Sequence, residues 1–388
     1  MQKIHLWPKE ISEQDGLVTA SAVIEMPGGE RQELWYRLPA EHRHALTSSC
    51  DPYVLACLFI AMRCPADLII HGQASPSLLR NLVEFQQAWA LWKPNRYTCI
   101  ETIPDSEQEQ PRLNTDAAIA AFSGGVDSCF TVYRHVTGQY GRWKRNVQAG
   151  VFIHGFDISL RIKEDYERAA AKARLMLDSL GLKMIPVATN AKKLGADLID
   201  EHGAFLAAAL SMFSGAYTSG LISSSIPYHM LALPWGTNPL TDPLLSSQSF
   251  QVVHDGCSHY KIDKIKAISG WPEAMQNLRV CLVGEFKDRN CCRCEKCART
   301  MIFFRALGLP RPPAFEQDIS DQQLRKMVCF HRETIDQYKV ALETARQNGI
   351  TASWTGALRQ MIYLNEMRVR LKKHPLLWKA GRKLLRGF

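Results

Sequence analysis

The stretch AFSGGVDSCF, residues 121–130, decides the fold of this 388-residue chain. It joins a short apolar run, which predicts a buried strand, to SCFTVYRHV, which predicts a helix. Further apolar runs alternate with helical patterns downstream, and their strands are expected at 147–156, 183–189 and 219–225. Strands that alternate with helices indicate a parallel sheet covered on both faces, and we expect five strands in it.

The loop within this stretch predicts a site for an anion. Gly124 and Gly125 allow a tight turn and bring backbone N–H groups close to a ligand. These groups meet the N-terminus of a helix, and the hydroxyls of Ser123 and Ser128 add donors. Asp127 would repel a bare phosphate, so we expect Mg²⁺ to bridge its carboxylate to the phosphates.

The pattern SGGxDS resembles the signature of the PP-loop ATP pyrophosphatases, whereas the endings of a Walker A loop and of GxGxxG are absent. The alternative is a plain glycine turn. The resemblance implies an α/β fold of the adenine nucleotide alpha hydrolase type, in which the loop holds the β- and γ-phosphates of ATP. Pyrophosphate then leaves, and the α-phosphate forms an adenylate with the substrate.

Two later segments carry the same resemblance. The run FIHGFD implies that the backbone at His154 and Gly155 holds the adenine. The run SHYKIDKI resembles the family's KxE helix start, with Lys261 as the lysine and Asp263 in place of the glutamate. Lys261 would neutralise charge on the transferred phosphate, so it joins Asp127 as a catalytic candidate. The alternative is a solvated helical lysine.

Five of the twelve cysteines lie between residues 281 and 297. Two Cys-x₂-Cys steps preceded by an upstream cysteine predict a closed tetrahedral zinc site of structural type. Its expected ligands are Cys281, Cys291, Cys294 and Cys297, which leaves Cys292 spare. An iron–sulfur cluster and free reduced thiols are the alternatives.

The loop and the cysteines together resemble the QueC group, the 7-cyano-7-deazaguanine synthases, over residues 117–310. The sequence departs from that group at three points. Nine residues follow the first cysteine where the group has seven or eight, and Thr300 stands where the group has an arginine. The group's SGYPDCR segment has no literal copy here, and WGTNPLTDPLLSS, residues 235–247, takes its place.

The resemblance implies that residues near this segment bind the deazaguanine. Asp242 is the counterpart of the group's aspartate, and its carboxylate suits the N1–H and amino group of a guanine edge. Trp235 and His254 are the other substrate-binding candidates; His254 falls in a predicted loop, 252–260. The alternative for Asp242 is a turn aspartate, and the alternatives for His254 are a general base and a loop histidine that forms hydrogen bonds. Cys129 either has a lowered pKa at the helix start or packs beneath the helix.

The chain is longer than a plain QueC protein and resembles the longer QueC-like proteins of bacterial anti-phage defence islands. That resemblance implies a ligase or synthase that adenylates 7-carboxy-7-deazaguanine and joins it to an amine. Ammonia would give the amide and then the nitrile preQ0, whereas a protein N-terminus would give a conjugate. The expected partners are ATP, the deazaguanine and an amine-bearing protein, with a second copy of the chain as a further candidate. Nucleic acid is not required.

Three domains are expected. A small mixed α/β domain at 1–112 ends in a polar linker around 102–116, a PP-loop domain with a zinc lobe follows at 113–312, and a helical extension occupies 313–388. The N-terminal domain is expected to contain two strands and two helices. These lie at 17–26, 31–38, 48–64 and 75–92.

The charge distribution is uneven. The formal net charge is +9, and eight basic residues without an acidic one follow residue 367, so the body of the chain is nearly neutral. No secretory leader is recognisable and the longest apolar run, 53–62, is too short to cross a bilayer, so we expect a soluble cytoplasmic protein. A tRNA-modifying PP-loop enzyme and a non-catalytic zinc module remain competing hypotheses.

Overall fold

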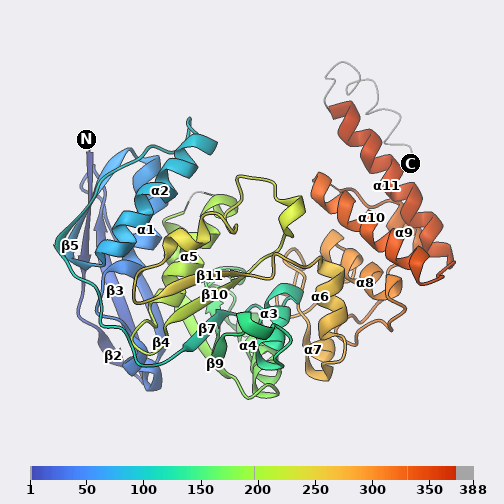
Figure 1. Cartoon of the computed structure of the whole chain (residues 1–388), viewed down its shortest axis with the longest axis horizontal. Coiled ribbons are helices and arrows are strands. Elements are labelled where there is room, and N and C mark those ends of the chain that lie inside the picture. The colour runs from blue at the N-terminus through green and yellow to red at the C-terminus, as the bar shows by residue number, and fades with distance from the viewer. Residues whose placement is uncertain (1, 196, 330, 373–388) are drawn as a thin grey trace. The chain divides into compact units, whose positions relative to one another are not determined.

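The computed structural model describes residues 2–195, 197–329 and 331–372 (Figure 1). Residues 373–388, which hold most of the predicted basic tail, lie outside the described residues. Contacts between Cα atoms group the chain into two compact units. The first unit contains residues 1–123 and 127–257, and the second contains residues 124–126 and 258–388.

The first unit is built on one 11-stranded sheet with the order β11-β10-β7-β8-β9-β4-β3-β1-β5-β6 and with β2 paired to β3. Its strands are β1 (Gln2–Pro8), β2 (Ser12–Gln14), β3 (Leu17–Glu25), β4 (Arg31–Pro39), β5 (Ala66–Ala74), β6 (Thr102–Glu107), β7 (Ala117–Ala121), β8 (Asn146–His154), β9 (Lys183–Thr189), β10 (Ser219–Ser223) and β11 (Gln251–Asp255).

Five neighbouring strands, β11-β10-β7-β8-β9, are all parallel, which confirms the predicted five-stranded parallel sheet. The chain builds this sheet outward from β7 in one direction to β9, then returns to β10 on the other side of β7. The strand order therefore reverses between β7 and β10. In open parallel sheets, the crevice at such a reversal, beyond the carboxyl ends of the strands, is where ligands bind.

Helices connect these strands. The helix α3 (Val126–Val136) joins β7 to β8, and α4 (Lys163–Asp178) joins β8 to β9 and packs on both. The helix α5 (Leu198–Ser211) packs on β7 and β10. Because parallel crossovers are right-handed, the reversal of winding after β9 puts α5 on the opposite face from α3 and α4. The chain is thus an α/β protein with a large, mostly parallel sheet.

The N-terminal strands continue this sheet. The strand β4 pairs antiparallel with β9, with Tyr36 opposite Thr189, so the predicted N-terminal strands and the parallel sheet share one hydrogen-bonded layer. The helices α1 (Asp51–Arg63) and α2 (Pro76–Trp92) confirm the two predicted helices, and α1 packs on α5 and β5. The strand β6 takes up the first residues of the expected linker.

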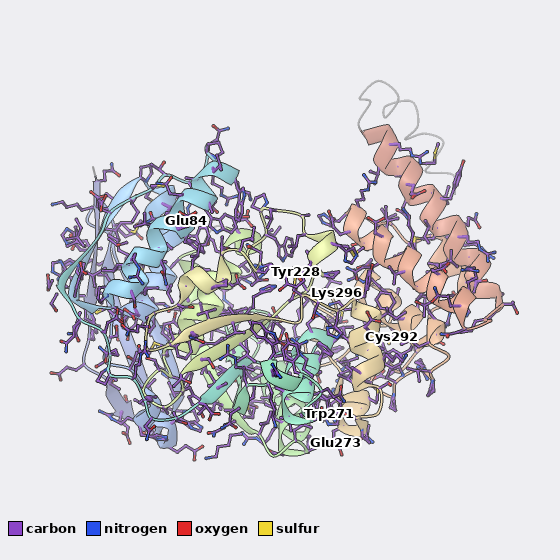
Figure 2. All side chains as sticks on the ribbon, viewed as in Figure 1. Glu84, Tyr228, Trp271, Glu273, Cys292 and Lys296 are labelled. Atoms are coloured by element: carbon purple, nitrogen blue, oxygen red, sulfur yellow. The ribbon has the colours of Figure 1, made fainter. Side chains whose placement is uncertain are left out.

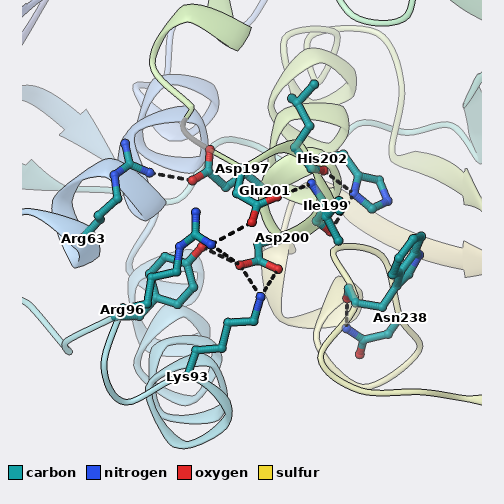
Figure 3. A network of polar contacts seen from close by, with 12 residues as sticks. Arg63, Lys93, Arg96, Asp197, Ile199, Asp200, Glu201, His202 and Asn238 are labelled. Carbon is teal, nitrogen blue, oxygen red and sulfur yellow. Dashed lines mark hydrogen bonds and ion pairs between the residues drawn. The ribbon is translucent and has the colours of Figure 1, made fainter. Parts of the chain in front are cut away.

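A buried polar network ties the N-terminal segment to the start of α5 (Figure 3). The fully buried carboxylate of Asp200 accepts hydrogen bonds from Lys93 Nζ at 2.5 Å and from Tyr97 Oη at 2.8 Å. Arg96 Nη1 donates to Asp197 at 2.7 Å, one turn before. Since a buried carboxylate is stable only when paired, this network fixes α5 against the N-terminal segment.

One prediction near the site is wrong. Residues 252–255, expected in a loop, form most of β11, which pairs in parallel with β10. The run QVVHD is short and ends in polar residues, so it lacks the apolar periodicity of the other strands. Its pairing with β10, from Ser219 opposite Gln251 to Ser223 opposite Asp255, makes it the edge strand.

Among its described residues, the second unit contains helices but no strands, and the helices from residue 321 onward lie in the predicted helical extension. Its helices are α6 (Lys261–Ile268), α7 (Pro272–Asn277), α8 (Glu295–Ala306), α9 (Asp321–Arg325), α10 (Arg332–Gln347) and α11 (Ser353–Lys372). Across the described part of the chain, no helix combines the length and the apolar character that crossing a bilayer requires.

Candidate functional site

The glycine loop lies where the sequence predicts it, between β7 and α3. Phe122 N–H donates to Val151 O at 2.9 Å, which extends the pairing of β7 with β8 by one residue. The backbone then turns at Gly124, whose φ of 73° falls in the left-handed region that favours glycine. The helix begins at Val126, so the N–H groups of its first turn follow directly on the loop.

The two serines of the loop contact each other. Ser123 N–H donates to Ser128 Oγ at 3.2 Å, and the two hydroxyl oxygens are 3.3 Å apart. Ser128 is almost fully buried, and Asp127 lies in the first turn of α3. The Ser128 hydroxyl therefore holds the loop in its turned form, in which backbone N–H groups and a carboxylate lie together at a helix start.

The strand on the other side of the reversal supplies a further polar group. Ala120 of β7 lies opposite Leu221 of β10, so Ser223 lies about level with the first loop residue. Ser223 Oγ is buried and has no hydrogen-bond partner among the described residues. A buried hydroxyl without a partner is costly, so this edge of the sheet is suited to a polar ligand.

His154 and Gly155 lie at the carboxyl end of β8, beside β7. The ring of His154 stacks on Tyr166 at 4.1 Å, its Nε2 lies 2.9 Å from Ser159 O, and burial lowers its pKa. Gly155 has φ of 114°, and a Cβ there would meet Thr189 O at 2.0 Å. Only glycine fits this position, which leaves the backbone at the sheet edge bare of side chain.

The structure joins the three predicted substrate-binding residues through hydrogen bonds. His254 Nδ1 lies 2.8 Å from Asp242 Oδ2, and the other oxygen of Asp242 accepts from Asn238 N–H at 3.1 Å. Asn238 Nδ2 in turn donates to Trp235 O at 2.8 Å. Both carboxylate oxygens of Asp242 thus have protein partners, and a direct contact between Asp242 and a base stays a prediction.

Two nitrogen atoms of this group lack partners. Trp235 Nε1 and His254 Nε2 are buried without a hydrogen bond to any described residue. Burial alone would lower the pKa of His254, but the Asp242 carboxylate bonded to it and the neighbouring Cys257 side chain outweigh burial and raise this pKa to about 9. The histidine therefore holds a proton readily at neutral pH.

A second buried carboxylate, that of Asp255, lies one residue further along β11. Burial opposes ionisation of Asp255, but the His135 and Arg134 side chains bonded to it lower its pKa to about 2. Thr131 Oγ1 also donates to it, at 2.7 Å. These three partners are on α3, so the cluster fixes the helix that follows the glycine loop against β11.

Cys129 packs beneath the helix, as one of the two predictions for it states. It is fully buried, its Sγ lies 3.9 Å from the sulfur of Met176, and burial raises its pKa strongly. A thiol in such a place stays protonated and is inert.

The predicted lysine belongs to the second unit. Lys261 is the first residue of α6, and the Asp263 carboxylate accepts from the backbone N–H of Tyr260 at 3.2 Å. Asp263 therefore caps the helix that Lys261 begins. A role for Lys261 at the transferred phosphate stays a prediction.

The four predicted metal ligands lie together in the second unit. The sulfur atoms of Cys281, Cys291, Cys294 and Cys297 all lie within 4.8 Å of one another. Cys281 and Cys294 are 3.8 Å apart, and Cys291 and Cys297 are 3.9 Å apart. Four sulfurs at about 2.3 Å from one tetrahedral ion are about 3.8 Å apart, so this group could hold a metal ion such as zinc.

Backbone donors support the sulfur atoms. Cys281 Sγ accepts from Gly284 N–H at 3.2 Å, and Cys291 Sγ accepts from Cys294 N–H at 3.3 Å. Such bonds stabilise thiolates, the form that binds metal. The pKa of Cys294 is lowered to about 5, chiefly because the Cys297 thiol donates to it. The same hydrogen bond raises the pKa of Cys297, so the two sulfurs share a proton that a bound metal ion would displace.

Cys292 lies outside this set, as predicted. It has φ of 55°, and its Sγ lies 3.6 Å from Asn290 O. The side chain of Asn290 holds the loop through two hydrogen bonds. Its Oδ1 accepts from Val280 N–H at 2.9 Å, and its Nδ2 donates to Leu278 O at 2.8 Å. The left-handed turn at Cys292 therefore directs its thiol away and leaves Cys291 and Cys294 to face the other two cysteines.

Comparison with family models, with curated proteins and with solved structures found no significant match to this chain.

Proposed function

We propose that this chain is a QueC-like PP-loop ATP pyrophosphatase that adenylates the carboxylate of 7-carboxy-7-deazaguanine and joins it to an amine. The observation that carries the proposal is the position of the SGGVDS loop. It follows β7 at the reversal of a parallel sheet ordered β9-β8-β7-β10-β11 and leads straight into a helix. In an open α/β sheet, this is the place best suited to bind a nucleotide phosphate.

The roles of the loop residues follow from their chemistry. Backbone N–H groups at Gly124 and Gly125 would bind the β- and γ-phosphates, with Ser123 and Ser128 adding donors. Asp127 would hold Mg²⁺, which screens the phosphates and favours the departure of pyrophosphate. The bare backbone at Gly155 admits a flat ring at the end of β8, where we propose that the adenine binds.

In the reaction, a carboxylate oxygen of the deazaguanine attacks the α-phosphorus of ATP and pyrophosphate leaves. The product is a mixed anhydride, whose carbonyl carbon an amine then attacks with loss of AMP. We propose Lys261 as the cation that stabilises charge on the transferred phosphate. The four cysteines would hold zinc in a structural role, because four thiolates leave no position for substrate.

The identity of the amine that attacks the adenylate is the second part of the proposal. We favour a protein N-terminus, in a conjugation reaction of anti-phage defence, because the N-terminal segment and the helical extension add surface that ammonia does not need. Ammonia, which would give preQ0 through the amide, is the alternative.

The test is product analysis by mass spectrometry. The full chain, Mg–ATP and 7-carboxy-7-deazaguanine should yield AMP and pyrophosphate only when the deazaguanine is present, and ammonium distinguishes nitrile formation from conjugation. Ser128→Ala should lower the rate of AMP formation about a hundredfold. Ser211→Ala, a buried serine of α5 that bonds only locally to Ala208 O, is the matched control. Absence of deazaguanine-dependent AMP would reject the substrate and favour a tRNA-modifying enzyme or a non-catalytic module.

A further inference from the structure

Three side chains at the end of β11 and in the segment before it have the arrangement of an activated nucleophile. Asp242 and His254 are bonded at 2.8 Å through Oδ2 and Nδ1, and their side chains are only 1% and 3% exposed. A carboxylate at Nδ1 fixes the orientation of an imidazole and leaves Nε2 as its reactive atom. Here Nε2 is buried and has no hydrogen-bond partner among the described residues.

The third side chain is the thiol of Cys257. The chain turns at Gly256 directly after β11, so Cys257 follows His254 by three residues, and its thiol is close enough to raise the pKa of that histidine. A histidine that carries a proton at neutral pH forms an ion pair with a neighbouring thiolate, and this pairing favours loss of the thiol proton.

The thiol has a resting position that it can leave at small cost. Cys257 Sγ donates to Ile226 O at 3.2 Å, in the segment after β10 that also carries Tyr228, labelled in Figure 2. Ile226 O accepts a second bond from Ser224 Oγ at 2.7 Å. If the thiol rotates towards His254, the carbonyl therefore keeps a partner, whereas His254 Nε2 gains one.

We propose that Cys257 is a nucleophile that takes the acyl group from the adenylate as a thioester before it reaches the amine, with the His254 imidazolium stabilising its thiolate and Asp242 as the positioning residue. This inference rests on the proposed function, since the adenylate must form first. The ester would hold the acyl group on the protein while an amine-bearing partner binds, and a thioester reacts with amines in preference to water.

Both steps conserve atoms and electrons. The thiol releases its proton to water, the Cys257 thiolate beside the His254 imidazolium attacks the carbonyl carbon, a carbon–sulfur bond forms, and the carbon–oxygen bond to AMP breaks with its electrons leaving on AMP. The neutral amine then attacks the same carbon, the carbon–sulfur bond breaks, and the thiolate is restored beside the imidazolium. The amine nitrogen releases one proton to water, so no oxidant or reductant is needed.

The test traps the thioester. The full metal-loaded chain, incubated with Mg–ATP and 7-carboxy-7-deazaguanine without amine, should gain the mass of the acyl group at Cys257, and hydroxylamine should remove it. Cys257→Ser should still form AMP but transfer acyl groups to ammonium or a model peptide at least about tenfold more slowly. Cys99→Ser, which removes a half-buried cysteine of the N-terminal segment, should transfer at the wild-type rate.

Wild-type transfer rates in Cys257→Ser, or AMP formation with no adduct at Cys257, would overturn the proposal. Circular dichroism establishes that each variant is folded. A separate readout does not depend on ATP: alkylation of Cys257 by iodoacetamide at pH 7 should be about tenfold slower in His254→Gln than in the wild type. Equal rates would overturn the thiol–imidazole pair. If no AMP forms at all, the proposed function fails, and the alkylation rates alone decide the pair.

Discussion

The Sγ atoms of Cys281 and Cys294 lie 3.8 Å apart, although thirteen residues of chain separate them. This separation is far longer than a disulfide bond and matches two ligands of one tetrahedral ion. A [4Fe–4S] cluster binds one thiolate per iron and spreads its ligands more widely, whereas all four sulfurs here lie within 4.8 Å. The geometry therefore favours a single ion.

The first prediction concerns this site. Cys294→Ser should abolish stoichiometric metal in elemental analysis of the purified protein and lower the melting temperature by about 10 °C or more, because a four-thiolate site contributes directly to folding free energy. Cys292→Ser, whose sulfur faces Asn290 O, should keep the metal. Metal loss in both variants alike would contradict the assignment of ligands.

The second prediction concerns the close approach at Gly155. Gly155→Ala should lower the free energy of unfolding by about 3 kcal/mol or more, because φ is 114° and the new Cβ would lie 2.0 Å from Thr189 O. Gly16→Ala, with φ of 71° and no described atom within 4 Å of the new Cβ, should cost only about 1 kcal/mol. Similar losses in urea denaturation would count against the observed contact.

A third prediction follows from the raised pKa of His254. Because this pKa is about 9 in the folded protein, the bound proton stabilises the fold fully below about pH 6.5, the usual value for histidine. The stabilisation is lost as pH rises from about 6.5 to about 9, and the loss amounts to about 3 kcal/mol. Denaturation curves across this range should show that slope in the wild type and in His44→Gln, which removes an exposed histidine. The slope should be nearly absent in His254→Gln, and a wild-type slope in that variant would reject the pairing.

The fourth prediction concerns the network in Figure 3. Asp200→Ala removes the fully buried carboxylate that Lys93 and Tyr97 bond, and it should destabilise the protein by about 2 to 3 kcal/mol because the buried hydroxyl of Tyr97 and the ammonium group of Lys93 lose their acceptor. Glu343→Ala breaks solvent-exposed contacts with Arg346 and Gln347 on α10 and should leave the melting temperature unchanged. Equal melting temperatures for the two variants would show that the network contributes little.

The sequence could predict those features that short stretches encode locally. The glycine loop, the apolar strands before and after it, and the helices α1 and α2 follow from periodicity and from turn residues a few positions apart. The four metal ligands follow in the same way, since all lie within 17 residues of chain. In each case the physical determinant is local.

Features that depend on pairing between distant strands escaped prediction. The antiparallel pairing of β4 with β9 joins the N-terminal strands to the parallel sheet through two residues of each strand, and no local pattern indicates it. The edge strand β11 was missed because its polar side chains bond to α3 and to Asp242 rather than to an apolar core. The same strand pairing brings His254 to Asp242. Asp242, His254 and Cys257 can each be picked out in the sequence, but their proximity depends on this pairing and could not be predicted.

The most direct test of the proposed function follows the carboxylate oxygen. The full chain is supplied with Mg–ATP and 7-carboxy-7-deazaguanine that carries heavy oxygen in both carboxylate positions, and the AMP is weighed by mass spectrometry. Attack of the carboxylate on the α-phosphorus predicts AMP with one heavy oxygen atom. AMP without the label, label in inorganic phosphate, or no AMP that depends on the deazaguanine would contradict adenylation of this substrate.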